Sequence, residues 1–268
     1  MILFKRIILF FSLVINSYFC KADNFEQDVH FTIHVTLNDI KHELSAFETL
    51  IYKNNSPFVL KEIYFHIWPN AYKDNSTILA KEIFQSGDDR MLAAKPDDLG
   101  MIDSLDFKVN DESVQWIFLK DTVDVCKIIL NKPLNPGSSI TISTPFHVKI
   151  PRSFLSRLGH NKQAYFITQW YPKPAVFDSS GWNYFPYHDQ GENICEFGSF
   201  DVYIKLPENY IITASGTMVN GDQELLRLLK NDSITRSVKI FPDQDSTPKS
   251  SKIFKTIHFH QEKVHDLR

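Results

Sequence analysis

The segment DVHFTIHVTLN, from Asp28 to Asn38, alternates apolar and polar residues over most of its length. Valine, isoleucine and phenylalanine occupy one set of positions, and histidine and threonine occupy the positions between them. A period of two is typical of a β-strand with one buried face and one exposed face. The segment therefore predicts a half-buried strand, and the same pattern recurs along much of the chain.

Two more strand patterns follow this one closely. LSAFETLIYKNN runs into an Asn-Asn-Ser-Pro turn, and FVLKEIYFHIW is closed by Pro69. Long strands joined by short polar turns favour antiparallel pairing. Further strand patterns occupy much of residues 105–150 and 197–266. We expect one all-β domain with large twisted antiparallel sheets and one or two short helices.

Three segments bear on the helices. STILAKEIFQSG is the best early helix candidate, with Ser76 as its cap and Gly87 as its stop. PRSFLSRLGH predicts a short helix that ends at Gly159. DQELLRLLKND, from Asp222 to Asp232, fits a short helix or a strand.

The N-terminus is typical of an export signal. Lys5 and Arg6 precede the apolar run 7–20, and small residues precede Asp23. Residues 1–22 are therefore expected to be a signal peptide cleaved near Ala22, which leaves no stable membrane span. The mature chain would be periplasmic, outer-surface or secreted. A membrane anchor and lipid attachment at Cys20 are the alternatives.

The net charge and the cysteine content limit which other functions the chain can have. The formal net charge is -3, so no basic excess is available to neutralise a nucleic-acid backbone, and we expect no nucleic-acid partner. After signal cleavage Cys126 and Cys195 remain, and an exported chain permits a disulfide between them. The sequence leaves that pairing open.

The histidines were tested as metal ligands. His30 and His34 are four apart, but Phe31 stands where the zinc-protease motif H-E-x-x-H requires glutamate. His258 and His260 share one face of a predicted strand, without a third ligand in view. We therefore expect sheet-face histidines and no metal ligand in this chain.

The carboxylates near the middle of the chain give no clearer catalytic centre. Asp189, Glu192 and Glu196 crowd together and could supply an acid and a base. The alternative is a polar loop before a strand, with Asp189 accepting backbone N–H groups. No G-x-S-x-G elbow and no phosphate-binding glycine loop occurs. The residues alone therefore predict no catalytic residue.

One segment is rich in aromatic residues but too interrupted by proline and glycine to be regular: TQWYPKPAVFDSSGWNYFPYHDQGE, from Thr168 to Glu192. Together with FHIWPNAY before it and FHQEKVHD after it, in this order, it resembles bacterial zinc aminopeptidases of the aminopeptidase N family, which are gluzincin metallopeptidases. The resemblance extends from Val29 to Asp266.

The resemblance implies that residues 23–268 form an N-terminal, saddle-like β-sandwich domain. In the full-length family this domain packs on a thermolysin-like catalytic domain that holds zinc, and it forms one wall of the substrate cleft. Trp170, Trp182 and Tyr187 are then expected to contact that catalytic domain, and some of these rings, or Tyr171, should be exposed here. The alternative is that the rings fill one end of the β-domain, and different residues can serve either purpose.

The same resemblance suggests two substrate-binding residues. The family's Thr/Ser-Gln pair is matched by Thr168 and Gln169. Two residues after this glutamine, many members have a glutamate or glutamine that binds the substrate's α-amino group, and here that position is Tyr171. A tyrosine hydroxyl can accept a hydrogen bond but brings no negative charge. Gln169 either substitutes for that function or is structural.

Neither G-A-M-E-N nor H-E-x-x-H occurs in the sequence, so no zinc-bound water is expected as a nucleophile. The resemblance thus predicts a truncated or split metallopeptidase that is inactive by itself. Its expected partners are a separately encoded catalytic domain and a peptide substrate. The alternative is a stand-alone exported β-domain that binds peptide or protein without catalysis.

Overall fold

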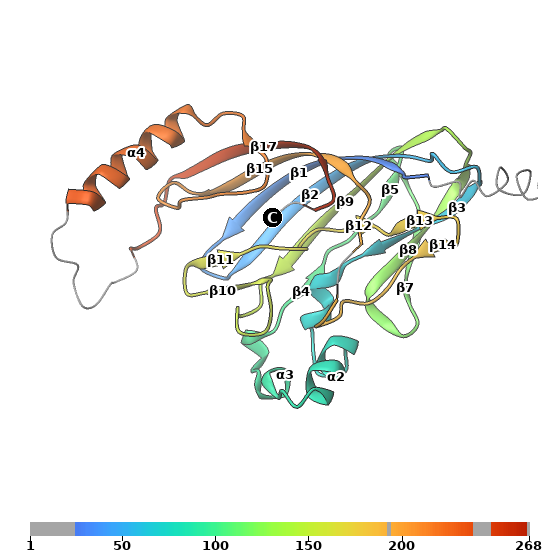
Figure 1. The fold of residues 1–268 in the computed structure, drawn as a ribbon, viewed down its shortest axis with the longest axis horizontal. Coiled ribbons are helices and arrows are strands. Elements are labelled where there is room, and N and C mark those ends of the chain that lie inside the picture. Colours follow the sequence, from blue (N-terminus) through green and yellow to red (C-terminus); the bar gives the residue numbers. More distant parts are fainter. Residues whose placement is uncertain (1–24, 192–193, 238–247, 267–268) are drawn as a thin grey trace, which may run out of the picture.

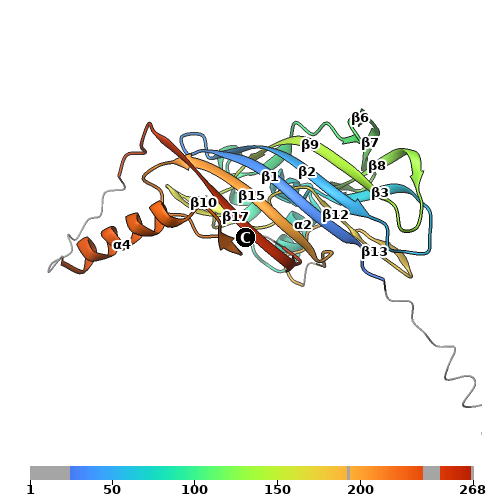
Figure 2. The same cartoon turned by 90° about the horizontal axis from the view of Figure 1, so that it is seen from above.

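The computed structural model describes residues 25–191, 194–237 and 248–266. The proposed signal segment 1–22, with Cys20, and the carboxylate of Glu192 lie outside the described residues. The described chain is dominated by strands arranged in two main sheets, as Figures 1 and 2 show. The predicted all-β fold with large twisted sheets is confirmed.

The larger sheet has nine described strands in the order β16-β17-β15-β1-β2-β9-β5-β6, with β4 paired to β9. Their bounds are β1 (Asp28–Asn38), β2 (Glu43–Lys53), β4 (Met101–Asp103), β5 (Lys108–Val109), β6 (Glu112–Ser113), β9 (Ser139–Lys149), β15 (Gly198–Pro207), β16 (Thr217–Met218) and β17 (Phe254–Val264). β1 and β15 pair in parallel, and the other pairs are antiparallel, so the sheet is mixed.

A four-stranded sheet packs against the larger one (Figure 1). Its order is β12-β3-β8-β7, with bounds β3 (Leu60–His66), β7 (Gln115–Leu119), β8 (Thr122–Leu134) and β12 (Lys173–Pro174). Two small hairpins complete the described strands: β10 (Gly159–Asn161) with β11 (Ala164–Phe166), and β13 (Val176–Asp178) with β14 (Gly181–Asn183).

The first predicted helix is confirmed as α2 (Ile78–Gln85), but its predicted cap is wrong. The Oγ1 atom of Thr77 accepts a hydrogen bond from the Ala80 amide at 3.1 Å, and the Ser76 hydroxyl instead donates to Asp74. Gly87 follows with φ of 88°, which favours glycine. The other helices are α3 (Arg90–Ala93), α4 (Asp222–Ser237) and the 3-10 turns η1 (Trp68–Tyr72) and η2 (Pro96–Asp98).

The helix predicted to end at Gly159 is absent from the described structure, where Gly159 begins β10. Amide–carbonyl bonds join Ser153 to His160 and His160 to Pro151, both at 2.9 Å. They draw the backbone of residues 151–153 against β10 instead of into a helical turn. A Cβ at position 159 would lie 2.5 Å from the Ser153 Cα, so this approach needs glycine.

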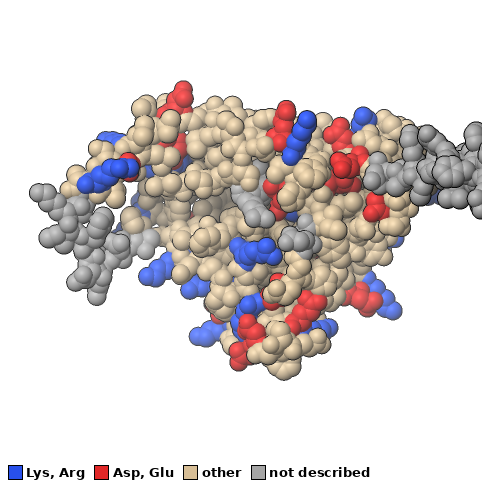
Figure 3. Space-filling model, viewed as in Figure 1, with Lys and Arg blue, Asp and Glu red and all other residues tan. Residues whose placement is uncertain are grey.

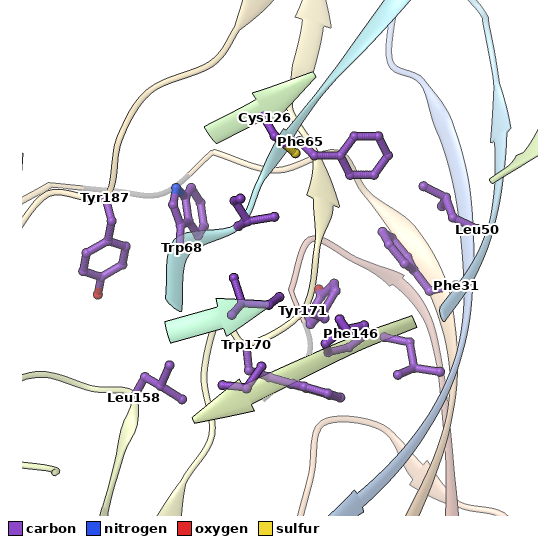
Figure 4. Packing of buried hydrophobic residues seen from close by; sticks show 14 of the residues in the cluster. Phe31, Leu50, Phe65, Trp68, Cys126, Phe146, Leu158, Trp170, Tyr171 and Tyr187 are labelled. Carbon is purple, nitrogen blue, oxygen red and sulfur yellow. The ribbon is translucent and has the colours of Figure 1, made fainter. Parts of the chain in front are cut away.

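The hydrophobic core lies between the two main sheets. Phe31 of β1 stacks on Phe200 of β15, with ring centroids 4.6 Å apart, and Phe65 of β3 faces it from the smaller sheet. Charged side chains of both signs are interspersed over the face drawn in Figure 3, in keeping with the small net charge. Figure 4 shows how rings from the aromatic segment enter this core beside Phe146.

A membrane-spanning helix must be both long and apolar. Across the stretches that the structure describes, no helix is both long enough and apolar enough to cross a bilayer.

Candidate functional site

The aromatic segment, residues 168–191 as described, is built into the smaller sheet. Lys173 pairs with His66 and Pro174 with Phe65, so β12 becomes the edge strand next to β3. Proline has no N–H to donate to a neighbouring strand, and an edge strand tolerates this because one of its sides has no neighbour. This pairing places the start of the segment between the two sheets.

A buried ion pair forms at this point. The Lys173 ammonium lies 2.7 Å from Oδ1 of Asp266, and the Tyr171 hydroxyl donates to the same oxygen at 3.0 Å. Lys173 is only 2% exposed, and Asp266 and Tyr171 are buried as well. A buried charge pair of this kind is tolerated only when the two charges are in close contact and their remaining hydrogen bonds are satisfied.

Two aromatic rings complete the surroundings of the ammonium. Lys173 Nζ lies 4.9 Å from the ring centroid of Trp68 and 4.9 Å from that of Tyr171. Both rings offer their faces as cation–π partners. Trp68 belongs to FHIWPNAY, Lys173 to the aromatic segment and Asp266 to FHQEKVHD, so the three stretches that carry the family resemblance meet at one charge.

Two more ionisable groups lie within the field of Lys173. Burial raises the pKa of Glu48 well above its usual value, with Lys173 opposing the shift. Its Oε2 atom has no hydrogen-bond partner among the described residues. Burial, aided by Lys173, lowers the pKa of His66 to about 3, so its imidazole is neutral. Among the described groups, Asp266 is the carboxylate that forms an ion pair with Lys173.

The rings predicted to face a catalytic domain were then located. Trp170 packs near Phe146, and Tyr187 near Tyr72, with centroids 5.8 Å and 5.7 Å apart. Trp170, Tyr171 and Tyr187 are all buried within this domain, as the alternative of rings that fill the β-domain has it for these three, and their contact with a catalytic domain stays a prediction. The physical reason is the pairing of β12, which carries the segment into the core. Trp182 is half-buried against Phe177 and Tyr64.

The two predicted substrate-binding residues differ in their settings. Gln169 has φ of 54°, a left-handed conformation that is uncommon outside glycine and marks a sharp local turn. This turn precedes Trp170 and Tyr171, whose rings both enter the core. Tyr171 is 1% exposed and donates to Asp266, so its ring lies inside the domain and not on an open wall. Their roles toward a substrate stay predictions.

Asp189 and Glu196 hold separate partners. The Arg90 guanidinium pairs with Asp189, and not the backbone amides that were expected. Glu196 accepts the amides of Phe177 at 3.1 Å and Gln27 at 3.3 Å. Burial raises the pKa of Glu196 to about 7 against these bonds. Both carboxylates therefore join segments that lie far apart in the sequence.

The sheet-face histidines form a cluster that the sequence did not reveal, because β1 and β17 both flank β15. Asp201 of β15 accepts from His258 at 2.7 Å and from His260 at 3.0 Å, and lies 3.6 Å from His30. Even so, no group of three or more His, Cys, Asp or Glu among the described residues is arranged to hold a metal ion. The described residues therefore do not fit the zinc of the resembling enzymes.

The sequence analysis also missed Lys173 and Asp266 as a pair. The signal was a lysine between two prolines in YPKP and an aspartate in VHD, but 93 residues separate the partners. Only the folded chain shows that they meet.

Comparisons with known proteins give matches among solved structures alone. No protein-family profile and no curated protein matches the sequence. Among solved structures, an M1 zinc metallopeptidase from Deinococcus radiodurans is 16% identical, with a TM-score of 0.44, over 88% of this chain and 39% of that one. Yeast LTA4 hydrolase in complex with bestatin is 13% identical, with a TM-score of 0.41, over 90% and 28%. The chain thus spans about two fifths of the first protein's length.

Proposed function

We propose that this chain is the N-terminal, substrate-cleft domain of a zinc metallo-aminopeptidase, exported after cleavage of residues 1–22. The observation that carries this proposal is the meeting of three separate sequence stretches at the Lys173–Asp266 pair. Each stretch was singled out by its resemblance to the aminopeptidase N family, and their convergence on one buried contact gives that resemblance a physical basis.

The ion pair also suggests how the domain would serve a cleft. Asp266 follows the last strand of the domain, which is where the catalytic domain follows in the resembling enzymes. Lys173 belongs to the aromatic segment, which those enzymes place at the cleft wall. A buried, doubly matched contact between the two would hold the wall at a fixed position relative to the catalytic part.

Charge balance at this contact bears on substrate recognition. Tyr171 stands where many family members have an acidic or amide residue for the substrate's amine. Here the adjacent carboxylate of Asp266 is already matched by Lys173. No uncompensated negative charge is left in this contact for an ammonium group, so amine recognition is assigned to the catalytic part.

The chain is proposed to be inactive by itself, because its sequence lacks H-E-x-x-H and its described residues do not fit a zinc ion. The test is the hydrolysis of aminoacyl test substrates by the mature chain, with and without added zinc. We expect no turnover above a mock preparation. Turnover that a chelator abolishes, and that the mock preparation lacks, would contradict the proposal.

A further inference from the structure

An apolar pocket of about 360 Å³ lies beneath one end of the larger sheet. Its roof is formed by Val35, Leu44 and Leu206 from β1, β2 and β15. The β10–β11 hairpin, which lies below these strands in Figure 1, supplies Tyr165, and Trp170 lines the pocket as well. Protein interiors are otherwise close-packed, so a hollow of this size is a feature to explain.

The lining limits what the pocket can hold. Of the described residues that line it, none carries a charged side chain. An apolar acid such as a fatty acid would therefore find no counter-charge in the pocket. The volume lies within the range of ligand pockets, about 300–1,000 Å³, and accommodates one large apolar side chain with room to spare.

Unpaired backbone runs along one side of the pocket. All residues from Tyr210 to Ala214 line it, directly after the turn that ends β15. Within the described parts of the chain, no backbone hydrogen bond reaches Ile211, Ile212, Thr213 or Ala214. Free N–H and C=O groups in a row are the feature that recruits an added strand.

The opposite side of the pocket offers a second edge. β11 pairs with β10 alone among the described strands, so its other edge is open. Phe166 of β11 is 57% exposed, and Ile211 across the pocket is 59% exposed. Two exposed apolar side chains thus flank the pocket between two unpaired backbone runs.

We propose that this pocket binds an extended peptide, which places one large apolar side chain inside while its backbone pairs with residues 211–214. A peptide is the ligand that matches both features, because it alone brings a row of amide donors and acceptors together with an apolar side chain. The proposal does not depend on the aminopeptidase assignment, since it concerns binding without hydrolysis.

The first test uses defined peptides and the mature chain. The probe is acetyl-Lys-Thr-Thr-Phe-Thr-Thr-Lys-amide carrying a fluorophore, with binding followed by anisotropy. We expect saturable binding, and a loss of roughly tenfold or more in affinity when serine replaces phenylalanine, because the serine peptide places no large apolar side chain in the pocket. No saturable binding, or equal binding of the two peptides, overturns the proposal.

A second pair of peptides tests the strand pairing. Alternate amides of the probe are N-methylated, on one edge in the first peptide and on the other edge in the second. One peptide should lose binding and the other should retain it, because an added strand uses one edge only. If both peptides bind like the parent, backbone pairing is ruled out.

Variants of the chain place the site. Ala214→Leu, which narrows the pocket, should weaken binding of the phenylalanine peptide, and Ala93→Leu on the exposed face of α3 is the matched control. Thermal unfolding checks that both variants fold. If Ala214→Leu does not fold, Thr213→Pro is compared with Thr213→Ala, because proline removes the backbone N–H donor at this position. Unchanged binding in both Ala214→Leu and Thr213→Pro contradicts the site. If sedimentation velocity shows that two copies of the chain associate through this pocket, the pocket is a dimer interface and the proposal is overturned.

Discussion

Lys173 carries the one charge on which the candidate site depends. Replacing it in Lys173→Met leaves the buried Asp266 carboxylate without its counter-charge, and we expect a loss of about 3–5 kcal/mol in the free energy of unfolding. Lys127→Met is the matched control, because Lys127 pairs with Glu62 at a partly exposed site and should lose only about 0–1 kcal/mol. Urea denaturation of both variants measures the difference. Equal, small losses would show that the buried pair does not stabilise the fold.

Glu196 should make stability depend on pH. Burial raises its folded pKa from the ordinary 4.5 to about 7, so the folded state holds this proton more tightly than the unfolded state does. The resulting stabilisation is full below pH 4.5 and is lost as pH rises through about 7. We expect Glu196→Gln to remove a change of up to about 3 kcal/mol over this interval.

The measurement for Glu196 is the difference in unfolding free energy between wild type and Glu196→Gln at several pH values. Asp124, whose pKa burial raises to about 6, remains in both proteins and cancels in the difference. Parallel curves for the two proteins would show that Glu196 does not titrate in this range.

At the scale of elements, the aromatic segment separates into core and surface parts. Trp170→Ala empties a buried site and is expected to lose about 3–5 kcal/mol of stability. Trp182→Ala should lose less, because Trp182 is only half-buried. Chemical denaturation of the two variants, with solubility measured alongside, tests this order. A larger loss for Trp182→Ala, or no loss for Trp170→Ala, would contradict the packing described above.

The elements also show what the sequence could predict. The alternation of Asp28–Asn38 correctly indicated a half-buried strand, because burial of one face depends on local pattern. The parallel pairing of β1 with β15 was not predictable, since about 170 residues separate the partners and alternation carries no register. The helix expected before Gly159 failed for a related reason, because tertiary backbone contacts outweighed local propensity.

The candidate site divides in the same way. Sequence motifs singled out Gln169, Trp170 and Tyr171, but the burial of all three side chains came with the pairing of β12 with β3, a contact between distant segments. The role of Lys173 could not be predicted, because its partner Asp266 follows β17 and lies 93 residues further along the sequence. The sequence pattern can therefore single out unusual segments, but the contacts between distant residues are known only from the folded structure.

For the whole molecule, the proposed function is that of one domain that works together with a separate catalytic part. The described chain forms two packed sheets, with the buried ion pair beside the end of β17. A neighbouring reading frame that encodes H-E-x-x-H with a downstream glutamate would supply the partner. The product of such a frame can be expressed apart from this chain and then mixed with it.

The measurement that tests the central claim most directly is aminoacyl-substrate turnover by the two parts, separately and mixed. We expect no turnover by this chain alone, and a rise of about tenfold or more in the turnover of the catalytic part when this chain is added, because a positioned cleft wall orients the substrate. The Lys173→Met variant should restore less turnover than wild type at equal concentrations. Turnover by this chain alone, or a catalytic part whose turnover is unchanged by adding it, would contradict the account.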